Sequence, residues 1–277
     1  IRHGGLADRL CGIVSAYNYC KKRGIQFRIH YVSPYRLKDI LVPNAYNWDI
    51  QENDLSYNKR DSRPICVSFL WNYADPEEYF NDKIENKEYK QLHLYTNARY
   101  FHPNEFPSLF DDLFKPSNAL RTMIDENRNR IPTHYVSLTF RFQQLLGDFR
   151  EDGFPILETQ KERDELIAKC LLCLKKLRES TKSPVLVTSD SITFLQKANE
   201  LDNVYIIPGM MRHMEYSKGE RDISVDMKSY VDFFMLANAD VIYLCKISPL
   251  YRSGFPETAS YVFNKPYVEL DENFIIV

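Results

Sequence analysis

Residues 133–142 read THYVSLTFRF and residues 184–190 read PVLVTSD, and these two apolar segments are the most informative ones for the fold class. Each has the length and the β-branched or aromatic content of a buried strand. Residues 160–178 between them have the apolar spacing of a helix. Buried strands that alternate with helices are typical of a parallel sheet with helices on both faces. The sequence therefore predicts a doubly wound, parallel α/β domain over residues 133–277.

The same alternation continues to the C-terminus, where apolar spacing predicts each further element. The expected elements are a helix over 191–201, a strand over 204–207, a helix ending at Ala237, a strand over 240–245, a helix over 259–263 and a strand over 267–270.

The N-terminal part opens with Gly4 and Gly5, directly before residues 6–23, whose apolar side chains fall at helical spacing. Residues 26–32 then alternate apolar and polar side chains, which predicts a strand. A glycine-rich turn, a helix and a strand in this order are typical of an α/β unit.

The middle of the chain has mixed signals. The expected elements there are strands over 65–71 and 91–97 and a helical stretch over 105–129 that is interrupted at Pro116. We place the domain boundary near Pro132. It separates an N-terminal α/β domain, residues 1–132, from the C-terminal domain, residues 133–277.

Composition restricts the function classes. Of the 277 residues, 44% are hydrophobic and 27% are charged, with a formal net charge of −2, which is a globular profile. The near-neutral charge argues against a dedicated nucleic-acid binder, which needs a surplus of Lys and Arg. No segment approaches the ~18 apolar residues of a transmembrane helix, and none has a signal-peptide pattern. Six scattered cysteines indicate reduced thiols, so we expect a cytoplasmic location.

Arg141 is the first candidate binding residue. Ligands of doubly wound sheets bind beyond the carboxyl ends of the strands, and Arg141 closes an apolar strand. Its guanidinium can donate two parallel hydrogen bonds to a diphosphate. The alternative is a salt bridge to Asp148 or Glu151 in the following loop.

Ser189 and Asp190 follow the second apolar strand and begin a helix. Both are good N-cap residues, which is a purely structural role. The functional alternative is that the Asp190 carboxylate accepts hydrogen bonds from the ring N–H and amino group of a guanine base.

Two glycine-containing segments precede helices. Ser253, Gly254 and Phe255 could direct a hydroxyl and backbone N–H groups at a phosphate near a helix N-terminus. Gly4 and Gly5 would allow a ligand to approach the backbone closely, or they form a tight turn.

The sequence contains no P-loop, serine nucleophile elbow, zinc-binding helix or Asp-x-Asp element after a strand. An arginine rather than a metal ion would then neutralise a departing diphosphate. We therefore expect neither a metal nor a cofactor.

Taken in order, these motifs resemble those of the fucosyltransferase superfamily, which comprises α-1,2-, α-1,6- and protein O-fucosyltransferases. Residues 4–10 (GGLADRL) resemble its N-terminal Gly-Gly-Leu element, with Ala7 in place of a glycine. Residues 136–141 (VSLTFR) resemble its His-x-Arg strand, with Arg141 at the arginine position and Thr139 in place of the histidine.

Four further segments follow in the same order as in that superfamily. They are 187–190 (VTSD), like its Thr/Ser-Asp element; 230–236 (YVDFFML), like its Val-Asp-x-x-x-Leu helix; 253–255 (SGF), like its Ser-x-Phe segment; and 264–266 (NKP), like its closing Gly/Asn-Lys-Pro.

The resemblance implies a divergent, bacterial-type enzyme with a GT-B fold, in which two Rossmann-like domains bind the acceptor in the first half and the donor in the second. It implies transfer of fucose from GDP-fucose to a glycan, with inversion and without a metal ion. Arg141 would contact the donor diphosphate, Asp190 the guanine, and residues 253–255 the phosphates.

Several assignments stay open. Asp148 and Glu151 lie where related enzymes place an acidic residue and are the candidates for a general base, although either could pair with Arg150. Thr139 in place of the histidine leaves open a different nucleotide sugar. A non-catalytic nucleotide- or carbohydrate-binding protein is the other alternative. Acceptor, linkage, oligomeric state and peripheral association with a membrane stay open too, and the resemblance suggests polysaccharide biosynthesis.

Overall fold

The computed structural model describes residues 4–67, 75–84, 89–148, 153–209 and 223–276. The chain divides into two compact units, Ile1–Ser117 (unit 1) and Asn118–Val277 (unit 2).

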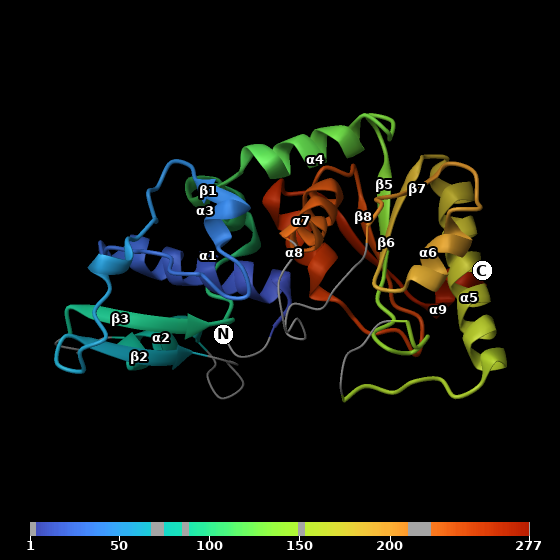
Figure 1. Cartoon of the computed structure of the whole chain (residues 1–277). Coiled ribbons are helices and arrows are strands. Elements are labelled where there is room, and N and C mark those ends of the chain that lie inside the picture. Colours follow the sequence, from blue (N-terminus) through green and yellow to red (C-terminus); the bar gives the residue numbers. More distant parts are fainter. Residues whose placement is uncertain (1–3, 68–74, 85–88, 149–152, 210–222, 277) are drawn as a thin grey trace. The chain divides into compact units, whose positions relative to one another are not determined.

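Unit 2 contains a five-stranded parallel sheet with the strand order β7-β6-β5-β8-β9 (Figure 1). The strands are β5 (Val136–Phe140), β6 (Val185–Ser189), β7 (Val204–Ile206), β8 (Ile242–Cys245) and β9 (Tyr267–Leu270). The chain runs from β5 outward through β6 to β7, and then continues on the other side of β5 through β8 to β9. The strand order therefore reverses between β5 and β8, which is where ligands bind in such sheets.

Helices cover both faces of this sheet, with α5 and α6 on one face and α7 and α8 on the other (Figure 1). The helices of unit 2 are α4 (Asn118–Arg128), α5 (Gln160–Thr181), α6 (Ile192–Ala198), α7 (Ile223–Ala237), α8 (Gly254–Val262) and α9 (Glu272–Ile276). Every residue of β5 and of β6 is buried, which explains why both read as continuous apolar runs rather than as alternating strands. The predicted doubly wound α/β sheet is confirmed.

Helix α8 begins earlier than its apolar spacing predicts. The expected start was Ala259, whereas the helix begins at Gly254. The reason is an N-cap: the Ser253 hydroxyl accepts a hydrogen bond from the backbone N–H of Phe255, 3.2 Å away. Pro256 lies in the first turn, where a missing backbone N–H costs nothing.

Unit 1 contains two small sheets beside its helices. Strand β2 (Ser62–Val67) pairs in parallel with β3 (Gln91–Thr96), and β1 (Leu41–Pro43) pairs with β4 (Phe114–Pro116) in antiparallel orientation. The α-helices are α1 (Leu6–Arg23), α2 (Pro76–Ile84) and α3 (Phe106–Leu113), and the 3-10 helices are η1 (Leu37–Asp39), η2 (Glu52–Asp54) and η3 (Pro103–Glu105). The predicted strand over 65–71 corresponds in part to β2, and its last four residues lie outside the described ranges.

The strand predicted over residues 26–32 is wrong, since this segment joins no sheet. Its backbone makes isolated hydrogen bonds instead of a ladder. The N–H of Ile29 donates to the carbonyl of Trp48, and the N–H of Phe27 donates to the Tyr46 hydroxyl, both over 2.9 Å. Alternating side chains indicate an extended segment, but a strand also needs a partner in register.

The two units meet in sequence at Ser117, earlier than the boundary expected near Pro132. Pro116 ends β4, and α4 starts at Asn118 as the first helix of unit 2. Helix α4 packs on α7, with Leu120 and Ile124 as its buried residues. A bilayer-spanning helix needs ~20 apolar residues, and no helix in the described ranges meets that requirement.

Candidate functional site

The candidate site lies at the switch point of the unit 2 sheet. Arg141 directly follows β5, and the segment from Lys246 to Ser253 follows β8, the neighbouring strand. The two segments are joined by a hydrogen bond from the backbone N–H of Tyr251 to the carbonyl of Arg141, over 3.0 Å. The structure thus places Arg141 where an α/β sheet binds its ligand.

Asp190 holds Arg141 from the end of the adjacent strand β6. The guanidinium Nη1 of Arg141 donates to Oδ2 of Asp190 over 2.7 Å. The Arg141 side chain is 19% exposed, whereas the Asp190 side chain is 2% exposed. The parallel register brings the two together, because Phe140 lies opposite Ser189. Arg141 therefore forms an ion pair with Asp190, a partner that the sequence did not suggest. Of the two suggested partners, Glu151 lies outside the described residues.

The same carboxylate also fixes the turn after β5. Oδ1 of Asp190 accepts from the N–H of Phe142 over 2.8 Å, and Oδ2 accepts from the N–H of Gln143 over 2.7 Å. The backbone of Gln143 has a φ of +56°. This is the left-handed region, which residues other than glycine, asparagine and aspartate rarely adopt. The Asp190 hydrogen bonds stabilise this strained turn.

Burial and hydrogen bonding act on Asp190 in opposite directions. Desolvation raises the pKa of its carboxyl above the ordinary value. Arg141 and the backbone N–H groups of Phe142 and Gln143 oppose that shift, because they stabilise the charged form.

Asp148 contacts the N-terminus of α6. Its Oδ2 accepts from the hydroxyl of Ser191 and from the backbone N–H of Thr193, each over 2.8 Å. A carboxylate at this end of a helix satisfies N–H groups that lack intrahelical partners and interacts favourably with the helix dipole. Glu151 and Arg150, the other acidic candidate and its possible partner, lie outside the described residues.

Ser253, Gly254 and Phe255 form the start of α8. The Ser253 hydroxyl serves as the N-cap acceptor, and Ser253 itself is buried. The Phe255 ring contacts the Phe233 ring of α7 at a centroid distance of 5.6 Å. The segment therefore forms the N-terminus of a nine-residue helix, which includes Gly254 and Phe255 rather than starting at Ala259.

Thr139, at the position where the resemblance expects a histidine, makes a purely internal contact. Its hydroxyl lies 2.8 Å from the hydroxyl of Thr188, directly opposite on β6. Both residues are buried in the sheet.

Gly4 and Gly5 lie in unit 1, at the start of α1. Gly4 has a φ of +135°, which favours glycine, and the N–H of Gly5 donates to Asp8 Oδ2 over 3.1 Å. The Arg9 side chain donates to the Gly4 carbonyl over 3.0 Å and to the Tyr31 hydroxyl over 2.9 Å. Gly5 is the N-cap residue of α1, with an extended backbone.

Two site features have no signature in the sequence. The contact from Tyr251 to Arg141 and those from Phe142 and Gln143 to Asp190 use backbone N–H groups, which every residue except proline carries. Only the fold shows which of these donors are directed at the site.

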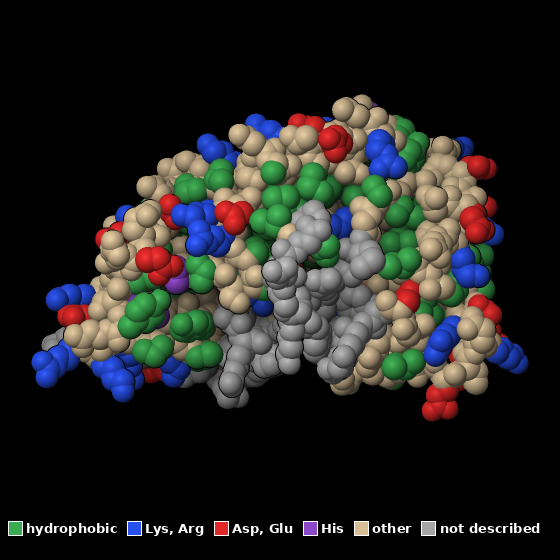
Figure 2. Space-filling view, viewed as in Figure 1, with side chains coloured by type: hydrophobic (Ala, Val, Ile, Leu, Met, Phe, Trp, Pro, Cys, Tyr) green, Lys and Arg blue, Asp and Glu red, His purple; other side chains and the backbone are tan. Residues whose placement is uncertain are grey.

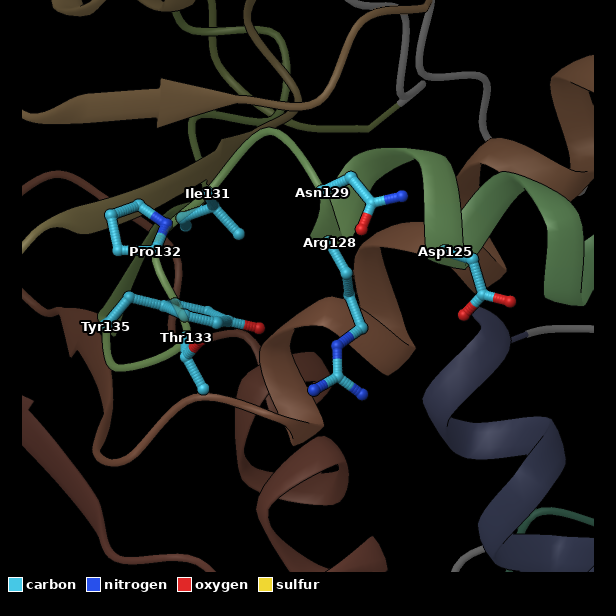
Figure 3. Close-up of a pocket in the computed structure, with 7 residues that line it drawn as sticks. All are labelled: Asp125, Arg128, Asn129, Ile131, Pro132, Thr133 and Tyr135. Atoms are coloured by element: carbon cyan, nitrogen blue, oxygen red, sulfur yellow. The ribbon is translucent and has the colours of Figure 1, made fainter.

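A wide cavity of about 460 Å³ lies at the opposite end of β5. Its lining residues are Asp125, Arg128, Asn129, Ile131, Pro132, Thr133 and Tyr135 (Figure 3). The Tyr135 ring extends toward Arg128, and its hydroxyl donates to the Met235 carbonyl over 2.6 Å. Since ligands of such sheets bind at the carboxyl ends of the strands, we assign the site to Arg141 and not to this cavity.

Charges of both signs are interspersed among the described residues on the face seen in Figure 2. This mixture agrees with the net charge of −2.

Comparison with known proteins identifies the fold. No protein-family model matches the sequence, and no curated protein matches it. Among solved structures, the fucosyltransferase NodZ from Bradyrhizobium is 16% identical over 97% of this chain and 92% of its own, with a TM-score of 0.61. The α-1,6-fucosyltransferase NodZ soaked with GDP-fucose is 17% identical over 98% of this chain and 93% of its own, with a TM-score of 0.59. A mutant of Arabidopsis thaliana FUT1 in complex with GDP is 14% identical over 97% of this chain and 68% of its own, with a TM-score of 0.59. The chain therefore has the fold of these fucosyltransferases, which is the GT-B architecture that the resemblance implies.

Proposed function

We propose that this protein is a glycosyltransferase that binds a nucleotide sugar on unit 2 and transfers fucose from GDP-fucose to a glycan. The observation that carries the proposal is Arg141, a partly exposed guanidinium held by an ion pair at the switch point of the sheet. The fold supports it, because NodZ was solved after soaking with GDP-fucose and FUT1 with GDP.

The proposed reaction is a single displacement with inversion. An acceptor hydroxyl attacks the anomeric carbon of fucose, the bond from that carbon to the diphosphate oxygen breaks, and GDP leaves with the electron pair. Arg141 stabilises the negative charge that develops on the departing diphosphate, which is electrostatic catalysis without a metal ion. The N-terminus of α8 at Gly254 supplies backbone N–H groups that favour a phosphate.

In this proposal the acceptor hydroxyl loses its proton to a general base, for which Asp148 and Glu151 are the candidates. Oδ2 of Asp148 is occupied by the N-terminus of α6, and Glu151 lies outside the described residues. In this proposal unit 1 binds the acceptor glycan, and the protein acts in the cytoplasm in polysaccharide biosynthesis.

A different nucleotide sugar is the second candidate donor. The observation that favours it is the Thr139–Thr188 hydroxyl pair, which replaces a histidine with a buried internal contact. The fold accommodates either donor, because fold alone does not specify a substrate.

Calorimetric titration with GDP-fucose, GDP-mannose, UDP-glucose and GDP tests the proposal. We expect GDP and GDP-fucose to bind and Arg141→Ala to weaken both roughly 10- to 100-fold, because hydrogen bonds to charged groups contribute about 1.5–3 kcal/mol. Arg141→Lys keeps a positive charge beside Asp190 and should lose less affinity, since lysine lacks the planar fork of donors.

Arg128→Ala is the matched control, because Arg128 lines the cavity at the opposite end of β5. It should leave nucleotide affinity unchanged. A loss with Arg128→Ala but not with Arg141→Ala would move the donor to that cavity. Wild-type protein that binds no guanine nucleotide would contradict GDP-fucose as the donor.

A further inference from the structure

The Asp190 carboxylate is already engaged in hydrogen bonds within the fold. Its carboxylate accepts three hydrogen bonds from the segment after β5, one from Arg141 Nη1 and one each from the N–H groups of Phe142 and Gln143. A carboxylate has about four acceptor positions on its two oxygens, and these three donors occupy most of them.

The burial of Asp190 is a second and independent reason why its carboxylate is not free to bind a base. A carboxylate that reads guanine must present both oxygens to the ring N–H and the amino group of the base. The Asp190 side chain is 2% exposed, and each of its oxygens already accepts a backbone hydrogen bond. A base could reach these oxygens only after the turn after β5 had been dismantled.

We propose that Asp190 is a positioning residue for Arg141 and does not read the base of the donor. This inference rests on the proposed function, because it assumes that Arg141 binds a diphosphate. Asp190 fixes the guanidinium through Oδ2 and fixes the backbone on the C-terminal side of Arg141 through Phe142 and Gln143. The N–H of Tyr251 fixes the Arg141 carbonyl.

The consequence concerns selectivity. Donor affinity depends on Asp190 through the diphosphate, which all nucleoside diphosphates share. The choice between guanine and other bases is made by other residues. A preorganised arginine binds its anion without first losing side-chain freedom, so loss of Asp190 weakens every nucleoside diphosphate to a similar extent.

The experiment measures the affinities of wild-type protein and Asp190→Asn for GDP, ADP and UDP by calorimetry. We expect Asp190→Asn to weaken all three by a common factor of roughly tenfold, with the GDP-to-ADP affinity ratio within about twofold of wild type. The double variant Arg141→Lys with Asp190→Asn should bind GDP only slightly more weakly than Asp190→Asn alone. The reason is that both changes weaken the same contact, the one between residue 141 and the diphosphate. A selective loss of GDP affinity in Asp190→Asn would overturn the proposal.

A crystal structure of the wild-type protein with GDP provides a test that does not depend on folding of the variant. A guanine ring nitrogen within hydrogen-bond distance of the Asp190 carboxylate would overturn the inference, and an intact Arg141–Asp190 pair against the diphosphate would support it. If the wild-type protein binds no nucleotide at all, the proposed function fails and this role of Asp190 fails with it. That outcome is distinct from a change in base preference.

Discussion

Gly12 lies where helix α1 comes closest to the end of strand β3. A Cβ added to Gly12 would lie 2.1 Å from the carbonyl oxygen of Thr96 and 2.8 Å from its carbonyl carbon. Backbone atoms cannot rotate away as a flexible side chain can, so any larger residue must push α1 and β3 apart.

Gly12→Ala should therefore lower the free energy of unfolding by about 3 kcal/mol, at the upper end of overpacking costs. The sign of this change in stability is informative. In the middle of a helix, replacing glycine with alanine otherwise raises the free energy of unfolding by about 0.5–1 kcal/mol. Gly5→Ala is the control, since an added Cβ there meets nothing within 4 Å. Chemical denaturation measures both variants, and a Gly12→Ala protein as stable as the control would disprove the close approach.

Helix α7 contains a buried ion pair. Nζ of Lys228 lies 2.6 Å from Oδ1 and 2.5 Å from Oδ2 of Asp232, one helical turn away. The two side chains are 6% and 2% exposed. Burial raises the pKa of the Asp232 carboxyl, and Lys228 acts against that shift. The pair allows a helix with buried residues on most sides to accommodate two charged side chains.

Removing one partner of this pair should be more destabilising than removing both. We expect Lys228→Met to cost about 3–5 kcal/mol of unfolding free energy, because it leaves the Asp232 charge buried and uncompensated. Lys228→Met combined with Asp232→Leu should recover most of that loss. A double-mutant cycle by urea denaturation measures the coupling, and additive costs would show that the two charges act independently.

The whole chain is built from two compact units, and their boundary can be tested by truncation. Helix α4 belongs to unit 2 and packs on α7. A fragment of residues 118–277 should unfold in one cooperative transition. A fragment of residues 133–277 lacks Leu120 and Ile124, whose burial contributes about 1.5–3 kcal/mol each, so it should be less stable by about 3 kcal/mol or more. Calorimetry measures both fragments, and equal stability would contradict the boundary at Ser117.

Prediction from the sequence was most accurate for unit 2. Strand β9 (Tyr267–Leu270) has the predicted bounds, and helix α5 (Gln160–Thr181) begins at the predicted residue. They are a partly buried edge strand and a capped helix. The Thr159 hydroxyl accepts from the N–H of Glu162, and the Glu162 carboxylate accepts from the N–H of Thr159. Prediction was poorest in unit 1, where the extended segment at residues 26–32 makes isolated hydrogen bonds.

Local patterns in the sequence were sufficient to predict the order of elements in unit 2 and the place of Arg141 at a strand end, because periodicity and capping depend on neighbouring residues. The partner of Arg141 was decided by the tertiary structure. Arg141 and Asp190 are 49 residues apart, and the parallel pairing of β5 with β6 brings them together. The hydrogen bonds of Asp190 were decided there too, since a carboxylate at a strand end can cap a helix, read a base or hold an arginine. Only the donors that the fold directs at its oxygens distinguish these roles.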